Sequence, residues 1–292
     1  MDLLLTGANG FVGSRLAKAL ESKPEIDLTA IIRRSVKERF NRVIILKEFD
    51  ANTDWSEAVK GKNVILHAAA HTHIMKDDAA NSMAKYRQIN VEGTLNLARQ
   101  AAAVGVARFV FISSIKVNGE TTEIGVPFTA DDIPKPIDKY GISKWEAEQG
   151  LLQLAADTGM EVVIIRPPLV YGPNVKGNFA KLVALLAKGV PLPLAAIKNQ
   201  RSFLAIDNLI DLIITCIDHP KAANQIFLAS DGHDLSTPEL LSGIATAMGR
   251  DARLFSVPPP LLSLAASLIG KKDEGNRLLG SLQVDIAKTR DV

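Results

Sequence analysis

Short apolar runs alternate with segments of helical periodicity through the first half of the chain. The runs contain several β-branched residues and are too short for helices, which is typical of strands covered on both faces of a parallel sheet. Between them, apolar positions recur at the spacing of amphipathic helices. The predicted strands are Leu3–Leu5, Leu28–Ile32, Val43–Leu46, Val64–Leu66, Phe109–Ile112 and Val162–Ile165, and the predicted helices are Arg15–Glu21, Trp55–Val59, Asn90–Val104 and Lys144–Ala156. This alternation predicts an α/β fold with a doubly wound parallel sheet.

The character of the chain changes after Arg166, where prolines divide it into shorter pieces. A cap assembled from loops and small helices would have this pattern. Two later apolar runs, Phe203–Ile206 and Gln225–Leu228, are expected to return to the main sheet. We therefore predict a sheet domain over residues 1–166, rejoined by residues 203–230, and a smaller cap over residues 167–202 and 231–292.

Composition narrows the class of protein. The 292 residues include 47% hydrophobic side chains and carry a formal net charge of +2, which suits a large core and gives no general case for nucleic-acid binding. The single cysteine, Cys216, lies in an apolar run, so no intrachain disulfide is expected. No signal peptide is expected before the first strand. The apolar stretch Leu261–Ile269 is too short to span a bilayer and is expected to be a packed helix, with a membrane-surface role as the alternative. We expect a cytoplasmic protein without an integral membrane segment.

A glycine-rich turn follows the first predicted strand. Gly7, Gly10 and Gly13 come directly after Leu3–Leu5 and lead into the first predicted helix. A strand, a tight glycine turn and a helix together place a dinucleotide pyrophosphate at a helix N-terminus. The sheet domain is therefore expected to bind a dinucleotide through a turn that contains Gly7, Asn9, Gly10, Phe11, Val12 and Gly13.

A second motif supplies acid/base chemistry. Tyr140 and Lys144 are four residues apart in a predicted helix and so project from one face. The lysine charge favours loss of the phenolic proton, which makes the tyrosine a usable proton donor and acceptor. The apolar strand Phe109–Ile112 ends in Ser113 and Ser114, where a parallel sheet delivers groups to its ligand crevice. Together these features indicate an oxidoreductase, and the pair His71 and His73 lacks the further ligands of a metal site.

Nearly the whole chain resembles an extended short-chain dehydrogenase/reductase of the NAD-dependent epimerase/dehydratase family. The resemblance rests on motifs that occur in the right order and spacing, namely Thr6–Gly13, His67–Ala70, Asn90, Ser113-Ser114, Tyr140-x-x-x-Lys144 and Arg166–Pro173. It implies a Rossmann sheet with a C-terminal substrate-binding cap. Within the family, the chain is similar to bacterial enzymes that act on C4 of UDP-linked hexoses in surface-polysaccharide synthesis.

The resemblance also assigns roles to residues. It implies that Tyr140 faces the C4 oxygen of the sugar, that Ser114 bonds the same oxygen, and that Lys144 holds the nicotinamide ribose. The further cofactor contacts that it implies are Asp50, Ala51, Ala68, Ala69 and Pro167, and the further substrate contacts are Asn178, Arg201 and Arg277. His67 is expected to be a packing residue, and Asn90 is expected to open a helix and brace it against the strand that carries the serines.

The cofactor preference depends on the end of the second predicted strand. NAD-preferring members of the family usually place an acidic residue there, whereas this chain has Arg33 and Arg34. A guanidinium can receive a 2′-phosphate, because its planar donors match phosphate oxygens. We therefore expect NADP, with NAD as the alternative; two arginines that are merely solvated would be the simpler interpretation.

Several reactions are compatible with these residues. We favour reduction of a nucleotide-linked 4-keto-hexose, with a UDP-hexose 4-epimerase as the close alternative. A catalytically silent NADP-binding regulator and an aldehyde or steroid dehydrogenase are more distant alternatives. Dehydration at C6 is not expected, because family members that perform it carry an Asp-Glu pair where this chain has Ile115 and Lys116.

Assembly is a further expectation from the resemblance. In the family, helices that correspond to Asn90–Val104 and Tyr140–Ala156 pair with their mates in a dimer, so we expect a homodimer. Packing of these helices on the sheet alone is the alternative. Related enzymes usually continue past the stretch Gln283–Val292 with a final helix, so the contacts of that tail are not expected here.

Overall fold

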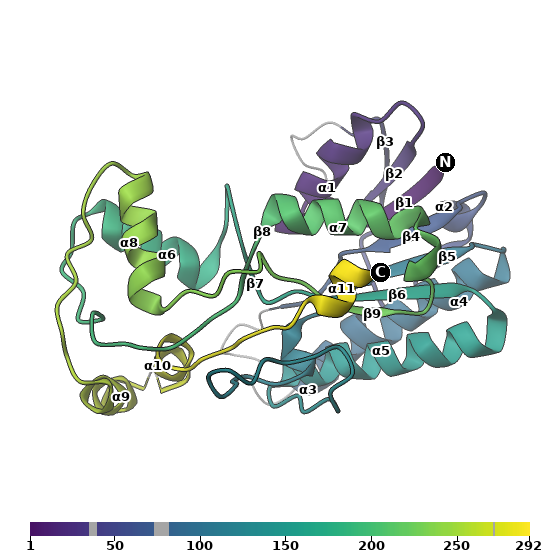
Figure 1. Cartoon of the computed structure of the whole chain (residues 1–292). Helices are drawn as coiled ribbons and strands as arrows, with labels where there is room; N and C mark the ends of the chain where they lie inside the picture. Colours follow the sequence, from purple (N-terminus) through teal and green to yellow (C-terminus); the bar gives the residue numbers. More distant parts are fainter. Residues whose placement is uncertain (35–39, 73–81, 271) are drawn as a thin grey trace.

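Figure 1 shows the computed structural model, in which a sheet with helices on both faces carries a smaller group of helices at one end. It describes residues 1–34, 40–72, 82–270 and 272–292, without the side chains of residues 178 and 272–274. Within these residues, seven strands form a parallel sheet in the order β3-β2-β1-β4-β5-β6-β9. The strands are β1 (Asp2–Thr6), β2 (Asp27–Ile32), β3 (Arg42–Ile45), β4 (Val64–His67), β5 (Arg108–Ile112), β6 (Glu161–Arg166) and β9 (Ile226–Leu228). The predicted doubly wound sheet is confirmed.

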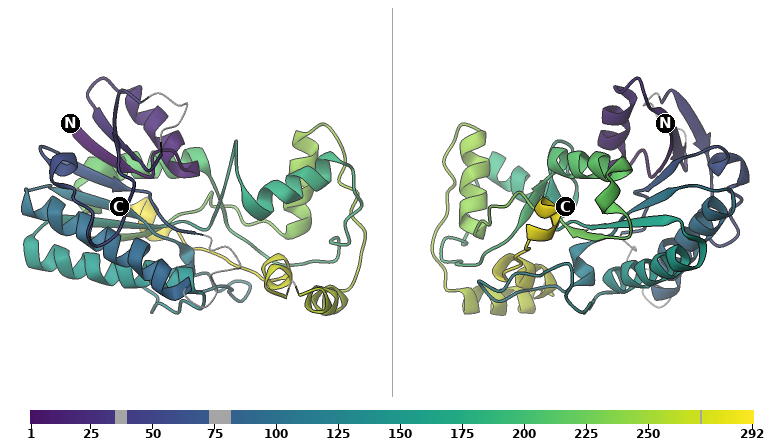
Figure 2. Two further views of the ribbon diagram at one scale, coloured as in Figure 1. Left: turned by 180° about the vertical axis from the view of Figure 1, so that it is seen from behind. Right: turned by 45° about the vertical axis from the view of Figure 1, so that its right-hand side comes forward.

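Two hydrophobic cores lie on opposite faces of this sheet. Because successive residues of a strand point to opposite faces, Leu3 and Leu5 of β1 join one core and Leu4 joins the other. The first core is covered by α1 (Phe11–Glu21) and α7 (Ile206–Asp218), and the second by α2 (Ser56–Val59), α4 (Thr94–Ala103) and α5 (Lys139–Thr158). Figure 2 shows the two helical layers from behind and from the side. Both faces are apolar, which explains the nearly continuous apolar runs of the strands.

One long helix contains an irregular turn. The helix α3 (Ser82–Tyr86) passes into a π-helical segment, Arg87–Gly93, which continues directly into α4. The expectation that Asn90 opens the helix is therefore wrong, because this residue lies inside the π-helical segment. Such segments occur mostly as single turns at functional sites, where the extra residue redirects a side chain.

A second, small sheet lies where the chain leaves the main one. The strand β7 (Leu169–Tyr171) follows β6 after two prolines and pairs in parallel with β8 (Phe203–Ala205). The expected return of Gln225–Leu228 to the main sheet is confirmed by β9, which pairs with β6. The same expectation for Phe203–Ile206 is wrong, because its backbone groups bond to β7 instead. Proline has no N–H to donate, so the chain cannot simply extend β6 through this point.

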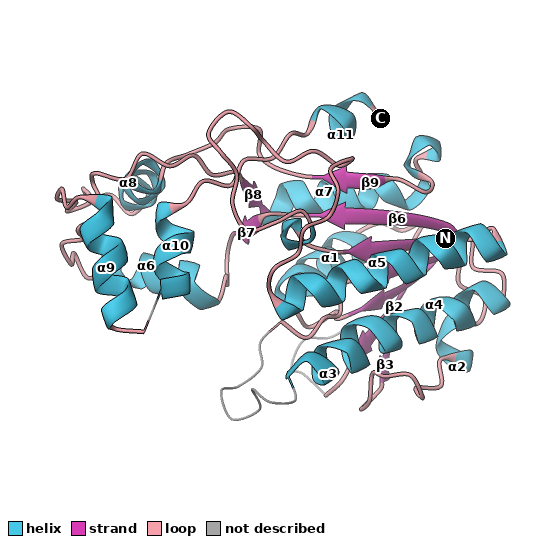
Figure 3. Cartoon of the chain, turned by 90° about the horizontal axis from the view of Figure 1, so that it is seen from below, coloured by secondary structure: helices cyan, strands magenta, loops and turns pink. Residues whose placement is uncertain are grey.

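The cap is built from short helices around a core of its own. The helices are α6 (Gly177–Ala187), α8 (Thr237–Ala247), α9 (Pro259–Leu268) and α10 (Lys272–Leu279). They surround a cluster that contains Leu186, Leu192, Leu194, Ile197 and Leu241. Figure 3 shows these helices beside the sheet domain, with the terminal helix α11 (Ala287–Asp291) back against the sheet. The domain boundaries stay a prediction.

The described part of the chain also contains two short helical turns, Ile115–Val117 after β5 and Pro220–Ala222 before β9. Among the described residues, no helix combines the length and apolar content needed to cross a bilayer. The helix α9 forms where a helix was expected around Leu261–Ile269, but the expectation that it is packed is wrong: none of its residues is buried, and Leu261 and Leu268 are 56% and 79% exposed.

Candidate active site

The glycine turn after β1 has the geometry of a phosphate cradle. Gly7 has a φ of +71°, and a Cβ there would lie 2.7 Å from the backbone nitrogen of Ala69. A Cβ on Gly13 would overlap the carbonyl of Gly7, so α1 packs directly on the turn. Gly10 is the N-cap of α1, so no capping side chain bonds the first backbone N–H groups of this helix. These N–H groups can therefore donate hydrogen bonds to an anion such as a pyrophosphate.

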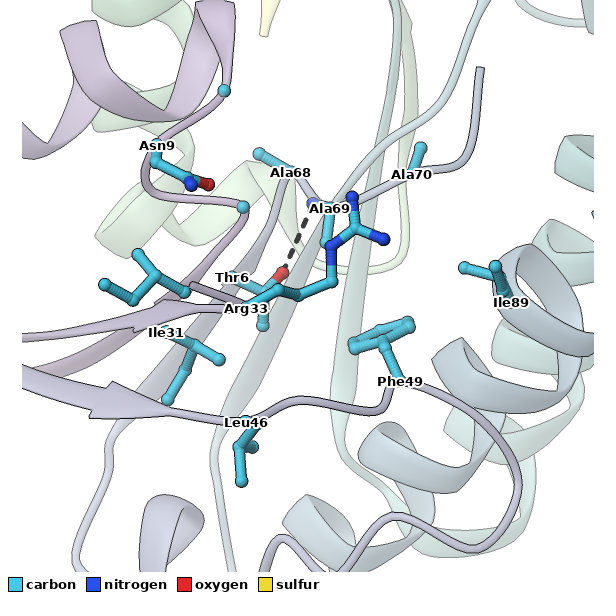
Figure 4. Close-up of a pocket in the computed structure, with 13 residues that line it drawn as sticks. Thr6, Asn9, Ile31, Arg33, Leu46, Phe49, Ala68, Ala69, Ala70 and Ile89 are labelled. Atoms are coloured by element: carbon cyan, nitrogen blue, oxygen red, sulfur yellow. Dashed lines mark hydrogen bonds between the residues drawn. The ribbon is translucent and has the colours of Figure 1, made fainter. Parts of the chain in front are cut away.

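A cavity of about 130 Å³ opens beside this turn (Figure 4). Its lining includes the predicted cofactor residues Gly7, Asn9, Gly10, Arg33, Ala68 and Ala69. It also includes residues that were not predicted, namely Thr6, Ile31, Ile32, Leu46, Phe49, Ala70 and Ile89. The apolar walls suit a flat ring system, and the exposed guanidinium of Arg33 provides a cationic group at the end of β2. The described residues therefore fit a dinucleotide whose adenosine part enters this cavity.

Other predicted cofactor residues lie around the cavity. Among the described residues, Asp50 and Ala51 do not line the cavity. The neighbouring Phe49 does. The Asp50 carboxylate instead accepts a bond from the backbone of Asn52, at 2.9 Å. Phe11 lines an adjacent cavity of about 680 Å³ beside the same turn, and Val12 lies in the first turn of α1.

Tyr140 lies in the first turn of α5. The helix begins after Asp138, whose carboxylate accepts a bond from the backbone N–H of Gly141 at 2.6 Å. Burial raises the pKa of the Tyr140 phenol, and the nearby Asp138 carboxylate and the Tyr86 phenol raise it further. A cation or a bound ligand that favours the phenolate is therefore needed before Tyr140 can act as a base.

Lys144 follows one helical turn later and is only 1% exposed. Its ammonium lies 3.8 Å from the ring centroid of Phe111 on β5, a cation–π contact. Burial lowers the pKa of Lys144 to about 7, and the carboxylate of Glu148 acts in the opposite direction. The amine is therefore easier to deprotonate than an exposed lysine.

Ser114 lies at the carboxyl end of β5. It caps the short helical turn Ile115–Val117, where its hydroxyl accepts a bond from the backbone of Lys116 at 3.3 Å. The backbone N–H of Ile115 donates to the carbonyl of Pro167, at 3.0 Å. This bond ties the end of β5 to the end of β6. It joins the neighbour of Ser114, the predicted substrate contact, to Pro167, a predicted cofactor contact.

Asn90 connects the π-helical segment to the start of α5. Its amide donates at 3.0 Å to the hydroxyl of Ser143, which in turn donates at 2.8 Å to the carbonyl of Tyr140. The same amide accepts a bond from the backbone N–H of His71 at 2.8 Å and donates one to the backbone carbonyl of His71 at 3.0 Å. Asn90 thus braces the helix that carries Tyr140, through a π-helical geometry that the sequence did not reveal.

His67 is a buried structural residue, as expected. It is 0% exposed, and its ring nitrogens lie 2.7 Å from the hydroxyl of Thr6 and 3.0 Å from that of Thr94. Burial and the nearby Lys144 ammonium hold the pKa of His67 well below its usual value. The ring therefore stays neutral and adds no second cation beside Lys144.

A buried ion pair lies behind the reaction centre. Arg166 at the end of β6 bonds the carboxylate of Glu148 on α5 through Nε and Nη2, the shortest contact being 2.6 Å. Ser113 donates to the same carboxylate, and Arg166 also donates to the side chain of Asn118 at 3.0 Å. Sequence reasoning missed this network. The placement of Glu148 four residues after Lys144 is the signal that could have suggested it.

The predicted substrate residues divide between two parts of the cap. Arg201 donates to the backbone carbonyls of Arg277 and Gly280, both at 2.8 Å. The guanidinium of Arg277 lies 3.8 Å from the carboxylates of Glu120 and Asp138, so it reaches the segment that precedes Tyr140. Asn178 lies in α6, and its side chain is outside the described residues. The structure therefore brings Arg201 and Arg277 together, and all three roles stay predictions.

Among the described residues, no group of three or more His, Cys, Asp or Glu side chains could hold a metal ion. His73, one of the two histidines considered for such a site, lies outside the described residues.

Residues 3–229 match the NAD dependent epimerase/dehydratase family. The chain belongs to this family. Its members act on nucleotide sugars as epimerases, dehydratases and reductases, so the expected NAD(P)-dependent nucleotide-sugar enzyme of the extended short-chain dehydrogenase type is confirmed at that level.

Two curated relatives and one solved structure are informative. The UDP-glucose 4-epimerase of Vibrio cholerae is 49% identical over 291 residues, which cover 99% of this chain and 89% of that one. The GDP-6-deoxy-D-mannose reductase of Pseudomonas aeruginosa is 29% identical and covers 83% and 79%, respectively. The Bacillus cereus UDP-glucuronic acid 4-epimerase in complex with NAD shares the fold with a TM-score of 0.79 at 22% identity, covering 100% of this chain and 92% of that one.

Substitution of Gly13 by Ala tests the cradle. The added Cβ would meet the Gly7 carbonyl, so we expect displacement of α1 and at least a tenfold loss of dinucleotide affinity, since backbone N–H donors would leave their positions. Gly243→Ala is the matched control, because a Cβ on that helical glycine of α8 meets nothing within 4 Å. Calorimetric titration with NAD and NADP measures both variants, and an unchanged affinity of Gly13→Ala would contradict the assignment.

Proposed function

We propose that the protein is a 4-epimerase of UDP-linked hexoses that retains NAD. The observation that carries this proposal is the 49% identity to the Vibrio cholerae UDP-glucose 4-epimerase along nearly the whole chain. The placement of Tyr140, Lys144 and Ser114 at one edge of the sheet supports it. This similarity favours the epimerase over the reductase that the sequence alone suggested.

In this proposal Tyr140 exchanges a proton with the C4 oxygen of the sugar. The Ser114 hydroxyl bonds the same oxygen, and the charged Lys144 favours the phenolate whose formation the buried site otherwise opposes. When bound, NAD would supply the acceptor for the hydride removed from C4 and would return it to the opposite face of the same carbon. Arg201 and Arg277 are proposed to hold the diphosphate, for which Arg277 must exchange its carboxylate partners for phosphate oxygens.

A second candidate is an NADP-dependent reductase of a UDP-4-keto-hexose. The observation that favours it is Arg33, which lines the adenosine cavity at the end of β2, where many NAD enzymes carry an acidic residue. A reductase consumes one cofactor for each product and must release it, whereas an epimerase gains by holding its cofactor. The catalytic residues are the same in both candidates. The number of cofactor molecules consumed for each product formed therefore distinguishes the two reactions.

We also propose that the protein is a homodimer paired through α4 and α5. These helices lie side by side on one face of the sheet, where the Leu95 side chain packs over Gly150. Val104 at the end of α4 is 53% exposed. Sedimentation equilibrium measures the assembly, and a mass of a single chain would exclude it.

Tyr140→Phe is expected to lower kcat by about 10²–10⁴, the usual contribution of general acid/base catalysis. Because only the hydroxyl is removed, binding of the dinucleotide and the unfolding midpoint in urea should stay close to those of the unchanged protein. Tyr86→Phe is the control, since it removes the neighbouring phenol, whose ring centroid lies 6.3 Å from that of Tyr140. Near-normal turnover by Tyr140→Phe would contradict the catalytic assignment.

Two parallel assays distinguish the epimerase from the reductase. The proposal predicts that UDP-glucose or UDP-N-acetylglucosamine is converted into its C4 epimer without added cofactor and without net change in absorbance at the NADH band. A UDP-4-keto-6-deoxy-N-acetylhexosamine supplied with NADPH should then remain unreduced.

The opposite pair of results would establish the reductase. Arg33→Asp is informative in that case, because an Asp at the strand end repels a 2′-phosphate and can bond the ribose hydroxyls. A change of preference from NADPH to NADH in this variant would assign the selection to Arg33.

A further inference from the structure

The ion pair between Glu148 and Arg166 is the most buried pair of opposite charges among the described residues. The two side chains are 0% and 2% exposed, respectively. Arg166 Nε lies 3.0 Å and 3.2 Å from the two carboxylate oxygens, and Nη2 lies 2.6 Å from one of them. Ionised groups are rarely enclosed so completely, because their desolvation offsets most of their mutual attraction. Stability alone is therefore a weak reason for this pair.

The pair connects the elements that carry the reacting groups. Glu148 extends from α5, Arg166 ends β6, and Ser113 at the end of β5 donates to the Glu148 carboxylate. Asn118 accepts from Arg166 and anchors the turn after Ser114 by donating to the carbonyl of Thr129 at 2.8 Å. The carboxylate thus fixes how α5 lies against both strand ends.

Glu148 also lies one helical turn after Lys144, on the same face of α5. The described groups that interact with the Lys144 ammonium are the neutral His67 on β4, the Phe111 ring on β5 and the Glu148 carboxylate on its own helix. Among these described residues, Glu148 is the only anion. Its carboxylate opposes the lowering of the Lys144 pKa by burial.

We propose that Glu148 is a positioning residue, which Arg166 and Ser113 hold in place so that its carboxylate keeps Lys144 charged and in register with Ser114. This proposal rests on the proposed function for its kinetic consequence. Its electrostatic consequence depends on the protein alone. The catalytic groups would therefore depend on a carboxylate that touches neither the substrate nor the cofactor.

The test is the protonation equilibrium of Lys144 in Glu148→Gln. Protein labelled with ¹³C at lysine Cε is titrated by NMR, and the Lys144 signal is assigned by its loss in Lys144→Met. We expect the midpoint of Glu148→Gln to lie about one pH unit below that of the unchanged protein, because the carboxylate that opposes the effect of burial on the Lys144 pKa is lost. An unmoved midpoint would overturn the proposal.

Glu146→Gln is the matched control. Glu146 lies two residues earlier on α5 and also pairs with an arginine, but its partner Arg87 is half exposed and the pair faces solvent. The Lys144 midpoint should be unchanged in this variant. An equal shift in both variants would mean that a general loosening of α5 moves Lys144, and would overturn the specific role of Glu148.

A double variant keeps the test valid if Glu148→Gln folds poorly. Replacement of Glu148 by Gln together with Arg166 by Met removes both buried charges, so no unpaired guanidinium remains. The low Lys144 midpoint should persist in this variant while the urea unfolding midpoint recovers. A midpoint that returns to that of the unchanged protein would show that the unpaired Arg166, and not the loss of the carboxylate, caused the shift.

The kinetic arm separates failure of this proposal from failure of the proposed function. With an active substrate, kcat is measured as the pH is raised. The pH at which kcat falls should be lower in Glu148→Gln than in the unchanged protein, because a deprotonated Lys144 no longer favours the Tyr140 phenolate. If no sugar nucleotide reacts, the NMR titration still decides the role of Glu148.

Discussion

A lysine ammonium that the fold almost completely encloses is the constraint on which the candidate active site depends. Lys144 is 1% exposed, and removal of its charge from water is costly. The protein compensates with the Phe111 ring above the ammonium and the Glu148 carboxylate one turn away. Without the carboxylate, burial would lower the pKa of the amine further.

The parallel sheet makes this arrangement possible. The carboxyl ends of β1, β4, β5 and β6 meet at one edge of the sheet, from which the glycine turn, the Ala68 segment, Ser114 and Pro167 follow. The helix α5 places the Lys144 ammonium over the Phe111 ring of β5. Residues that are distant in the chain are thus brought together in the fold.

Local features could be predicted from the sequence, and long-range features could not. The glycine turn, the strands and the spacing of Tyr140 and Lys144 are properties of short segments, and all of them form as predicted. The pairing of β8 with β7 depends on competition between two distant partners, which apolar periodicity does not rank. Likewise, the bond from Asn90 to Ser143 requires a π-helical segment that no residue pattern in the chain indicated.

The same limit applies to the site. The buried pair of Glu148 and Arg166 joins residues from α5 and β6 that are 18 positions apart, and nothing in the sequence analysis paired them. Phe49, and not the neighbouring Asp50, lines the cavity beside the glycine turn. Both residues lie in a loop, where the sequence pattern does not determine which side chain points into the cavity. The exact reaction is a further case, since Arg33 favoured a reductase and the similarity along the whole chain favours an epimerase.

The fate of a deuterium at C4 of the substrate tests the central claim most directly. UDP-[4-²H]glucose is incubated with the protein in ordinary water, and the UDP-galactose formed is analysed by mass spectrometry. If the reaction at C4 proceeds by hydride transfer within the closed site, the product retains its deuterium. Loss of the label to the solvent would contradict this account, and so would the absence of any C4 epimer.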